Sequence, residues 1–378
     1  MPEPFKNLFS YELIEGMARH LNRVHPSFNT KGFVTFAKTG LEDMELKERA
    51  SHLTDGLEEF LPDDFEHAVT ILVDSLDPET ESPLDANDSN SSPAGVRGWA
   101  IMSVADYVAR HGQENVALSL DALKAMTSRF SSEFAIRPFL LNHPDQTLEA
   151  MHSWQHDKNE HVRRLVSEGT RPRLPWDIQL KPFIQDPSPI LPLLESLKDD
   201  PSEYVRRSVA NNLNDISKDN PDLAAKTAQH WMGGANETRK RLVRHAMRTL
   251  IKAGHPGALK ALGYGKPKVS VEHFDISTPR VEMGEAVEFE LLLNSQSKTV
   301  QPLIIDYAVH HVRANGKTSP KVFKWKTVDL KAGAALNAVK RHNIKPVTTR
   351  KYYSGTHKVE LLVNGVSLVT KEFELIVD

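Results

Sequence analysis

The stretch from residue 159 to residue 176, NEHVRRLVSEGTRPRLPW, brings together residues that bind anions and a residue that stacks on flat rings. A helical run with paired arginines is followed by a short Pro-rich segment that holds Arg171, Arg173 and Trp176. Guanidinium groups pair bidentately with phosphate and keep their charge at physiological pH. An indole ring adds a stacking face, which also suits a cationic base. The stretch is therefore either a site for an anionic, aromatic ligand or a repeat corner in which Trp176 packs under the loop.

Six basic residues are the candidates for contacts with a phosphate backbone: Arg137, Arg164, Arg171, Arg173, Arg207 and Lys218. Such contacts give affinity that depends on salt and hardly on base sequence. In the two VRR motifs, the first arginines (Arg163 and Arg206) are expected to pair with an Asp of the adjacent repeat. The second arginines lie about 100° further round the helix, facing a groove or solvent.

Three carboxylates near these arginines are out of place in a plain polyanion site: Glu133 in SSEF, Glu168 in SEGT and Asp215 in NLND. A carboxylate facing DNA is repelled by phosphate, so its presence needs a compensating role. Stabilising a positively charged transition state is such a role, and hydrolysis of an N-glycosidic bond passes through an oxocarbenium-like sugar. The alternative is that these carboxylates only neutralise neighbouring arginines.

Other kinds of chemistry find no support in the sequence. There is no cysteine, which excludes disulfides, thiol catalysis and Cys-ligated zinc and fits a reducing compartment. No Gly-rich phosphate loop and no GxSxG turn occurs. His152, His156 and His161 can place at most two side chains on one helical face, so we predict no metal site.

The elements that must position these residues are predicted to be paired helices. Up to about Gly265, apolar residues recur at three- and four-residue steps, for instance over residues 97–112, 115–130, 190–200, 203–219 and 238–254. A branched apolar residue followed by Arg recurs near the period of HEAT-type helix pairs, and EHVRRLVSEG is the closest internal match to EYVRRSVANN. Such pairs stack into a curved solenoid with a concave surface. The polar segment 77–95 is predicted to be an exposed loop.

From Lys266 onward the pattern changes to the alternation of β-strands. Some seven short runs in about 110 residues, such as VEFELLLN and HKVELLVNG, predict a β-sandwich, and NGVS at 364–367 predicts a hairpin. The linker-like GYGKPK at 263–268 separates the two patterns. The predicted fold is a HEAT-like α-solenoid over residues 1–265 followed by an Ig-like β-sandwich over residues 266–378.

The charge is distributed unevenly along the chain. Its net charge of −3 combines a balance of −12 over residues 1–124 with +4 over 125–265 and +5 over 266–378. A basic body with an acidic leading segment is compatible with polyanion binding or with an uneven solvated surface. The N-terminus does not resemble a secretory signal, and no apolar run reaches membrane-spanning length, so we expect a soluble protein.

Taken together, SSEFAIRPFL, DKNEHVRRLVSEGTRPRLPW and EYVRRSVANNLNDISKDNP resemble the bacterial AlkC alkylpurine DNA glycosylases, relatives of AlkD. The resemblance runs through the helical part and is strongest from about Glu133 to Pro221; SEGTRPRLPW is its most specific string. It implies removal of cationic N-alkylated bases, such as 3-methyladenine, from duplex DNA during base excision repair. It also implies an Ig-like C-terminal domain in some members, and a duplex held in the groove without deep base flipping.

The resemblance further implies roles for single residues. Glu133 and Glu168 would flank the deoxyribose, Trp176 would lie against the lesion, and Asp215 would complete the acidic site, while Arg164 and Arg171 would anchor the flanking phosphates. No metal, nucleotide or redox cofactor is expected. We expect a monomer that binds DNA and no membrane, in the bacterial cytoplasm at the nucleoid. The competing hypothesis is a non-catalytic HEAT scaffold that binds DNA or protein.

Overall fold

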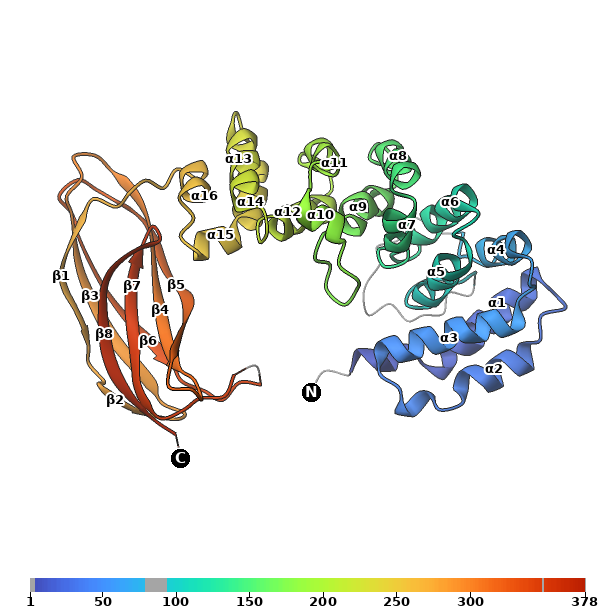
Figure 1. The fold of residues 1–378 in the computed structure, drawn as a ribbon, viewed down its shortest axis with the longest axis horizontal. Coiled ribbons are helices and arrows are strands. Elements are labelled where there is room, and N and C mark those ends of the chain that lie inside the picture. The colour runs from blue at the N-terminus through green and yellow to red at the C-terminus, as the bar shows by residue number, and fades with distance from the viewer. Residues whose placement is uncertain (1–3, 79–93, 349, 378) are drawn as a thin grey trace. The chain divides into compact units, whose positions relative to one another are not determined.

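The computed structural model describes residues 4–78, 94–348 and 350–377, and the predicted loop at 77–95 lies almost wholly outside them. The chain forms two compact units, residues 1–219 and residues 220–378. Sixteen α-helices fall in the described residues, and β-strands follow them (Figure 1). None of the described helices has the length and apolar character needed to cross a membrane.

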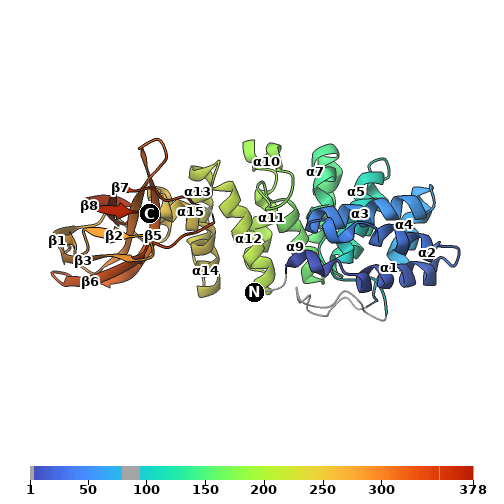
Figure 2. The ribbon, with the colours of Figure 1, turned by 90° about the horizontal axis from the view of Figure 1, so that it is seen from below.

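In its described residues, the first unit has twelve α-helices and two short 3-10 helices, Phe5–Leu8 and Leu41–Asp43. The α-helices are α1 (Tyr11–Val24), α2 (Thr30–Lys38), α3 (Leu46–Phe60), α4 (Phe65–Asp74), α5 (Ala100–His111), α6 (Val116–Thr127), α7 (Ile136–Asn142), α8 (Pro144–Trp154), α9 (Glu160–Gly169), α10 (Lys181–Gln185), α11 (Leu191–Leu197) and α12 (Glu203–Ile216). Helix α9 packs against α8, α11 and α12, and α11 also packs against α12. The pairs α8–α9 and α11–α12 are thus successive repeats, and Figure 2 shows α9 and α12 as neighbours.

Of the first arginines of the two VRR motifs, Arg163 makes the predicted pair with an Asp of the adjacent repeat, whereas Arg206 has no carboxylate partner among the described residues. Arg163 of α9 is paired with Asp200, with 2.6 Å between Nε and Oδ2. Arg163 also donates to the carbonyls five and six residues before it, and Arg206 of α12 makes the same pair of bonds to Pro201 and Asp200. These carbonyls precede the first turn of each helix. The two arginines therefore fix the loop that leads into each helix relative to the helix itself.

The second unit begins with four helices: α13 (Pro221–Met232), α14 (Glu237–Ala246), α15 (Arg248–Lys252) and α16 (Pro256–Ala261). The single helical run predicted over 238–254 is divided at Met247, which ends α14 and precedes α15. Tyr264, within the predicted linker, is buried with Leu259 of α16 and Ile304 of the following sheet. The predicted domain boundary at 265/266 coincides with the change from helix to strand, whereas the compact units divide at 219/220; the boundary therefore stays a prediction.

Eight strands complete the second unit: β1 (Val269–Ile276), β2 (Arg280–Glu282), β3 (Ala286–Ser295), β4 (Gln301–Val312), β5 (Thr318–Leu330), β6 (Ala335–Asn343), β7 (Gly355–Val363) and β8 (Val366–Ile376). They form one sheet in the order β1-β3-β6 and another in the order β2-β8-β7-β4-β5. Phe289, Leu291, Tyr307, Leu361 and Phe373, drawn from both sheets, share one buried core. The predicted fold class, mostly α with a C-terminal Ig-like sandwich, is confirmed.

The predicted hairpin at NGVS joins β7 to β8. Asn364 and Gly365 have φ values of 46° and 74°, as a two-residue hairpin turn with positive φ at both positions requires. Gly365 also lies against Gly254, where an added Cβ would come 2.3 Å from the Gly254 Cα. Only glycine fits at Gly365, because Gly254 leaves no room for a Cβ and the positive φ is strained for most side chains.

Candidate active site

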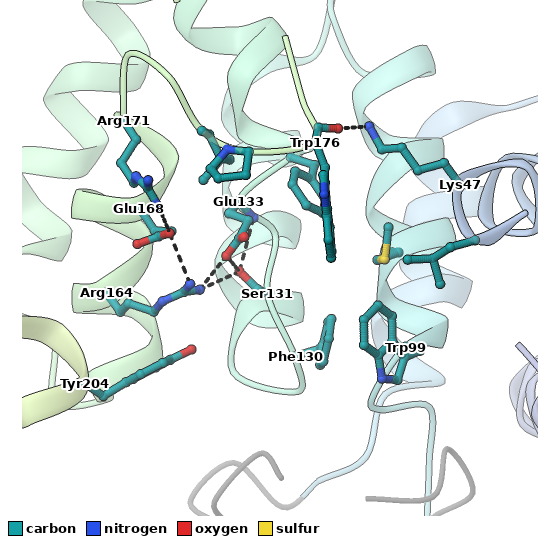
Figure 3. A pocket seen from close by; sticks show the side chains of 15 residues that line it. Lys47, Trp99, Phe130, Ser131, Glu133, Arg164, Glu168, Arg171, Trp176 and Tyr204 are labelled. Atoms are coloured by element: carbon teal, nitrogen blue, oxygen red, sulfur yellow. Dashed lines mark hydrogen bonds and ion pairs between the residues drawn. The ribbon is translucent and has the colours of Figure 1, made fainter. Parts of the chain in front are cut away.

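The predicted site residues converge where α9, α12 and the loop between α9 and α10 meet (Figure 3). Asn159 caps the N-terminus of α9 by accepting a hydrogen bond from the His161 amide. The helix then carries Arg164 and Glu168 on one side, one turn apart. Glu133 lies just before α7 and Arg137 lies in α7, whereas the remaining members come from the loop, from α12 and, for Lys218, from just after α12.

Arg164 joins two of the predicted carboxylates. Its Nη1 lies 2.5 Å from Glu133 Oε2, and its Nη2 lies 3.5 Å from Glu168 Oε1. The guanidinium also stacks on Tyr204, 4.8 Å from the ring centre, and donates to the Ser131 hydroxyl. Arg164 therefore contacts the carboxylates of both Glu133 and Glu168. These contacts, together with Tyr204 and Ser131, hold its guanidinium in place.

Glu168 is the most enclosed of these carboxylates, with only 5% of the residue exposed. Its Oε1 accepts from Arg171 Nη1 at 2.6 Å, and its Oε2 accepts from the Ser208 hydroxyl at 2.6 Å. Burial by itself would raise the pKa of Glu168, but Arg164, Arg171 and the Ser208 hydroxyl together hold this pKa below its ordinary value. Glu168 is consequently a carboxylate anion at neutral pH and a weak proton acceptor.

Asp215 continues the pattern on the far side of Arg171. Arg171 Nε lies 2.8 Å from Asp215 Oδ2, and Lys218 Nζ lies 2.8 Å from Asp215 Oδ1. The charges thus alternate from Glu133 through the two arginines and the two other carboxylates to Lys218. In this arrangement every one of the predicted acidic residues is paired with a predicted phosphate-binding cation, so the local charge is balanced.

The other predicted phosphate-binding residues, Arg173, Arg207 and Arg137, differ in their exposure and in their partners. Arg173 is about one-third exposed and forms a bidentate pair with Asp219, at 2.6 and 2.7 Å. Arg207 is exposed, and within the described part of the chain its side chain has no hydrogen-bond or ion-pair partner. Arg137 is different from both of these.

Arg137 is completely buried and faces the protein interior. It donates to the carbonyls of Gly169 and Arg171 at 2.9 and 2.8 Å and to the Ile178 carbonyl through two nitrogens. Burial lowers the pKa of Arg137 to about 10, against the opposing effect of Asp177, and leaves it charged at neutral pH. A buried guanidinium whose donors are used by backbone carbonyls cannot reach a phosphate. The predicted DNA contact of Arg137 is therefore replaced by a role in positioning the loop.

Trp176 is exposed, unlike the three predicted carboxylates, with 65% of its surface accessible. It borders a cavity of about 370 Å³ that Glu133, Glu168 and Arg164 also line. Its apolar wall includes Trp99, Met102, Phe130 and Phe134. Figure 3 shows Trp99 and Phe130 on the side away from Arg164 and Glu168. The alternative in which Trp176 packs under the Pro-rich loop does not fit this exposure.

Sequence reasoning missed Tyr204 and the apolar wall. Tyr204 occupies the position in EYVRR that His161 occupies in EHVRR, and the two rings contact each other edge to face at 5.6 Å. The difference between the two copies of the repeat was the available signal for Tyr204. Trp99 and Phe130 carried no signal, because aromatic residues in helical repeats usually pack in the core. No group of three or more possible metal ligands occurs within the described residues.

Comparison with known proteins places the chain in a family. A family model described as "Uncharacterised protein YhaZ, C-terminal Ig-like domain" matches residues 270–377. The uncharacterised protein YhaZ of Bacillus subtilis is 35% identical over 98% of this chain and 99% of its own length. The structure of the alkylpurine DNA glycosylase AlkC of Pseudomonas fluorescens, bound to DNA with an abasic site analogue, is 36% identical over 99% of this chain and 100% of that one, with a TM-score of 0.86. The chain belongs to the AlkC family.

AlkC family membership covers both units of the chain. The match to AlkC extends over the α9–α12 region, which holds the alternating charges, as well as over the sandwich. The resemblance stated from SEGTRPRLPW and its neighbouring strings is thereby confirmed. The roles of single residues in this AlkC-family protein rest on the geometry described above.

Proposed function

We propose that this AlkC-family protein is a DNA glycosylase that hydrolyses the N-glycosidic bond of cationic N-alkylated bases, 3-methyladenine among them, in duplex DNA. The observation that carries the proposal is the cavity in which the carboxylates of Glu133 and Glu168 lie beside the exposed indole of Trp176. The AlkC relative, whose structure contains DNA with an abasic site analogue, supports this reaction class. The protein would act in base excision repair as a monomer in the bacterial cytoplasm.

The chemistry requires little beyond electrostatics and a positioned water. When the bond between C1′ and the alkylated nitrogen breaks, both bonding electrons go to the base, which loses its positive charge and leaves as a neutral molecule. The sugar becomes an oxocarbenium ion, and a water molecule adds to C1′ and loses a proton. Anionic carboxylates stabilise this cation. Glu168, ionised by its two guanidinium neighbours, suits the stabilising role, and the less enclosed Glu133 can take the water's proton.

The cations of the site would bind DNA phosphates by exchanging a carboxylate partner for a phosphate. Arg164, Arg171, Arg173 and Lys218 are paired with carboxylates in the free protein, and an arriving phosphate would compete for their donors. Each exchange leaves a carboxylate with less compensation and more negative potential for the sugar cation. Arg207, exposed and unpaired within the described residues, can contact phosphate without such an exchange.

We also propose that the lesion is attacked without deep base flipping. The indole of Trp176 is exposed at the border of the cavity, so it can meet a nucleotide that remains in the duplex. A ring of this kind stabilises a cationic base or the C–H groups of a sugar by contact with its face. Asp215, which is almost fully buried, would act through Arg171 and not on the substrate.

The test is release of free base from methylated duplex DNA, with the products separated by chromatography. We expect 3-methyladenine-type bases and abasic sites to appear with the protein, and no base to be released from unmethylated duplex. Absence of base release from any methylated substrate, by folded protein, contradicts the proposal.

The second candidate function is a non-catalytic scaffold that binds DNA or protein. It is favoured by one observation: the arginines and carboxylates of the site compensate one another in the free protein. A scaffold would bind duplex DNA with a steep salt dependence and release no base, so the same assay separates the two functions.

A further inference from the structure

Trp176 has a backbone conformation that its side chain disfavours. Its φ of 68° lies in the left-handed region, and in the described residues Asn364 is the only other non-glycine residue with positive φ. Asn364 tolerates this conformation, because Asn is common in such turns. A bulky residue is strained in this conformation, so the surrounding structure must hold it there.

Hydrogen bonds hold the two ends of the loop between α9 and α10, but these bonds do not reach Trp176 itself. Arg137 binds the carbonyls of Gly169, Arg171 and Ile178. The Leu180 amide closes the loop by donating to the Pro172 carbonyl at 3.1 Å. These bonds fix the two ends of the loop, whereas the peptide group of Trp176 lies at its exposed tip.

The contact at Trp176 comes from a distant part of the sequence. Lys47, in the first turn of α3, donates from Nζ to the Trp176 carbonyl. The same ammonium lies 5.4 Å from the centre of the Phe134 ring, which adds a cation–π contact. Figure 3 shows Lys47 reaching the Trp176 carbonyl from the α3 side of the cavity, while the indole extends from that residue toward Phe130.

We propose that Lys47 is a positioning residue for the glycosylase reaction: its ammonium holds the Trp176 peptide in the left-handed conformation and so directs the indole along the cavity that contains Glu133 and Glu168. This proposal rests on the proposed function, because the indole contacts the lesion only if the protein acts on DNA. The alternative for an exposed lysine near a DNA site is direct phosphate binding, which predicts a different result in each measurement below.

Three variants separate these roles. Lys47→Met keeps the apolar stem and removes the donor, whereas Lys47→Arg keeps a cationic donor on a side chain of similar reach. Lys31→Met is the matched control, because Lys31 lies on α2, is exposed and has no side-chain partner among the residues that the structure describes. Circular dichroism and thermal unfolding establish that all three are folded.

The kinetic measurement is base release under single-turnover conditions, together with the affinity for duplex DNA. For Lys47→Met we expect the rate of the chemical step to fall about 10- to 100-fold, because the indole of Trp176 would no longer be held in its reactive position. The affinity should be unchanged, Lys47→Arg should recover most of the rate, and Lys31→Met should match the wild type. A loss of affinity with an unchanged chemical rate would overturn the proposal in favour of phosphate binding.

The second measurement needs no catalysis. Tryptophan labelled with fluorine reports all five indoles, Trp99, Trp154, Trp176, Trp231 and Trp325, and Trp176→Phe assigns the resonance of Trp176. In Lys47→Met we expect that resonance to shift or broaden while those of the buried Trp154 and Trp231 stay unchanged. An unaltered Trp176 resonance overturns the proposal even if activity falls. A wild-type protein without base release contradicts the proposed function, and the fluorine spectrum then still decides whether Lys47 holds Trp176.

Discussion

Glu168 is both anionic and buried, as the proposed stabilisation of a cationic transition state requires. Its two carboxylate oxygens are used by Arg171, Arg164 and the Ser208 hydroxyl, so its desolvation is compensated. Its lowered pKa means that the charge persists well below neutral pH. A plain DNA-binding surface has no use for such a residue, because it repels phosphate.

Replacing Glu168 by Gln is predicted to lower the chemical rate strongly while the protein stays folded. The amide keeps the shape and can still accept hydrogen bonds, but it removes the negative charge that, in the proposed mechanism, stabilises the sugar cation. By analogy with the loss of one preorganised electrostatic group, we expect a decrease of about 10²–10³-fold in single-turnover base release. Glu160→Gln, an exposed change at the start of α9, serves as the control. Unchanged base release by Glu168→Gln would remove Glu168 from the proposed mechanism.

At the scale of elements, the loop between α9 and α10 is the part that converts a repeat corner into a site. Arg137, one repeat earlier in the chain, supplies its internal support by binding carbonyls at both of its ends. From the sequence, Arg137, which precedes a proline, was predicted to be a cation that contacts DNA. Its complete burial shows that it serves the loop backbone.

Substitution of Arg137 by Met is therefore predicted to destabilise the protein. The change leaves the buried carbonyls of Gly169 and Arg171 and the partly buried carbonyl of Ile178 without their donor. We expect the free energy of unfolding to fall by about 2–4 kcal/mol, measured by urea denaturation. Arg207→Met, at an exposed position with no side-chain partner in the described residues, should change stability by less than about 0.5 kcal/mol. If Arg137→Met instead kept full stability and lost only DNA affinity, the originally predicted phosphate contact would be correct.

At the scale of the whole molecule, the β-sandwich contains a buried group that ties stability to pH. His311 of β4 is 2% exposed, and neither of its ring nitrogens has a hydrogen-bond partner in the described residues. Burial, with the nearby Arg350 and His357 adding to it, lowers the pKa of His311 to about 3. The folded state thus keeps His311 neutral, whereas the unfolded chain takes up a proton as pH falls below about 6.5.

The stability from a neutral His311 is complete above about pH 6.5 and is lost progressively toward pH 3, because over this range only the unfolded state binds the proton. We expect His311→Phe to match the wild type at pH 8 and to unfold with a free energy about 1 kcal/mol higher at pH 5, after allowance for solvent screening. Chemical denaturation at the two pH values measures this difference. His152→Gln, at an exposed position on α8, should follow the wild type. Equal pH dependence in wild type and His311→Phe would show that His311 does not contribute.

Several elements could be predicted because their signals are local. Apolar spacing gives the helices, the VRR repeat gives the equivalence of α9 and α12, and Asn364-Gly365 gives the hairpin. Three strands, β1, β2 and β6, were not identified individually. β6 has a weak signal, because its inward positions are only half-buried and two of them are the polar residues Lys340 and His342. The break at Met247 was missed because apolar spacing continues across it.

By itself the sequence determined the two kinds of domain, the arginine–carboxylate composition of the site and the presence of Trp176 near it, since all of these depend on residue type and short-range spacing. Tertiary structure alone decided which charges meet. It buried Arg137, placed Tyr204 under Arg164 and brought Lys47 of α3 to the Trp176 carbonyl, 129 residues further along the chain. Burial and long-range contacts are properties of packing between helices, and the identity of a charged residue does not indicate whether its partner will be a phosphate, a carboxylate or a backbone carbonyl.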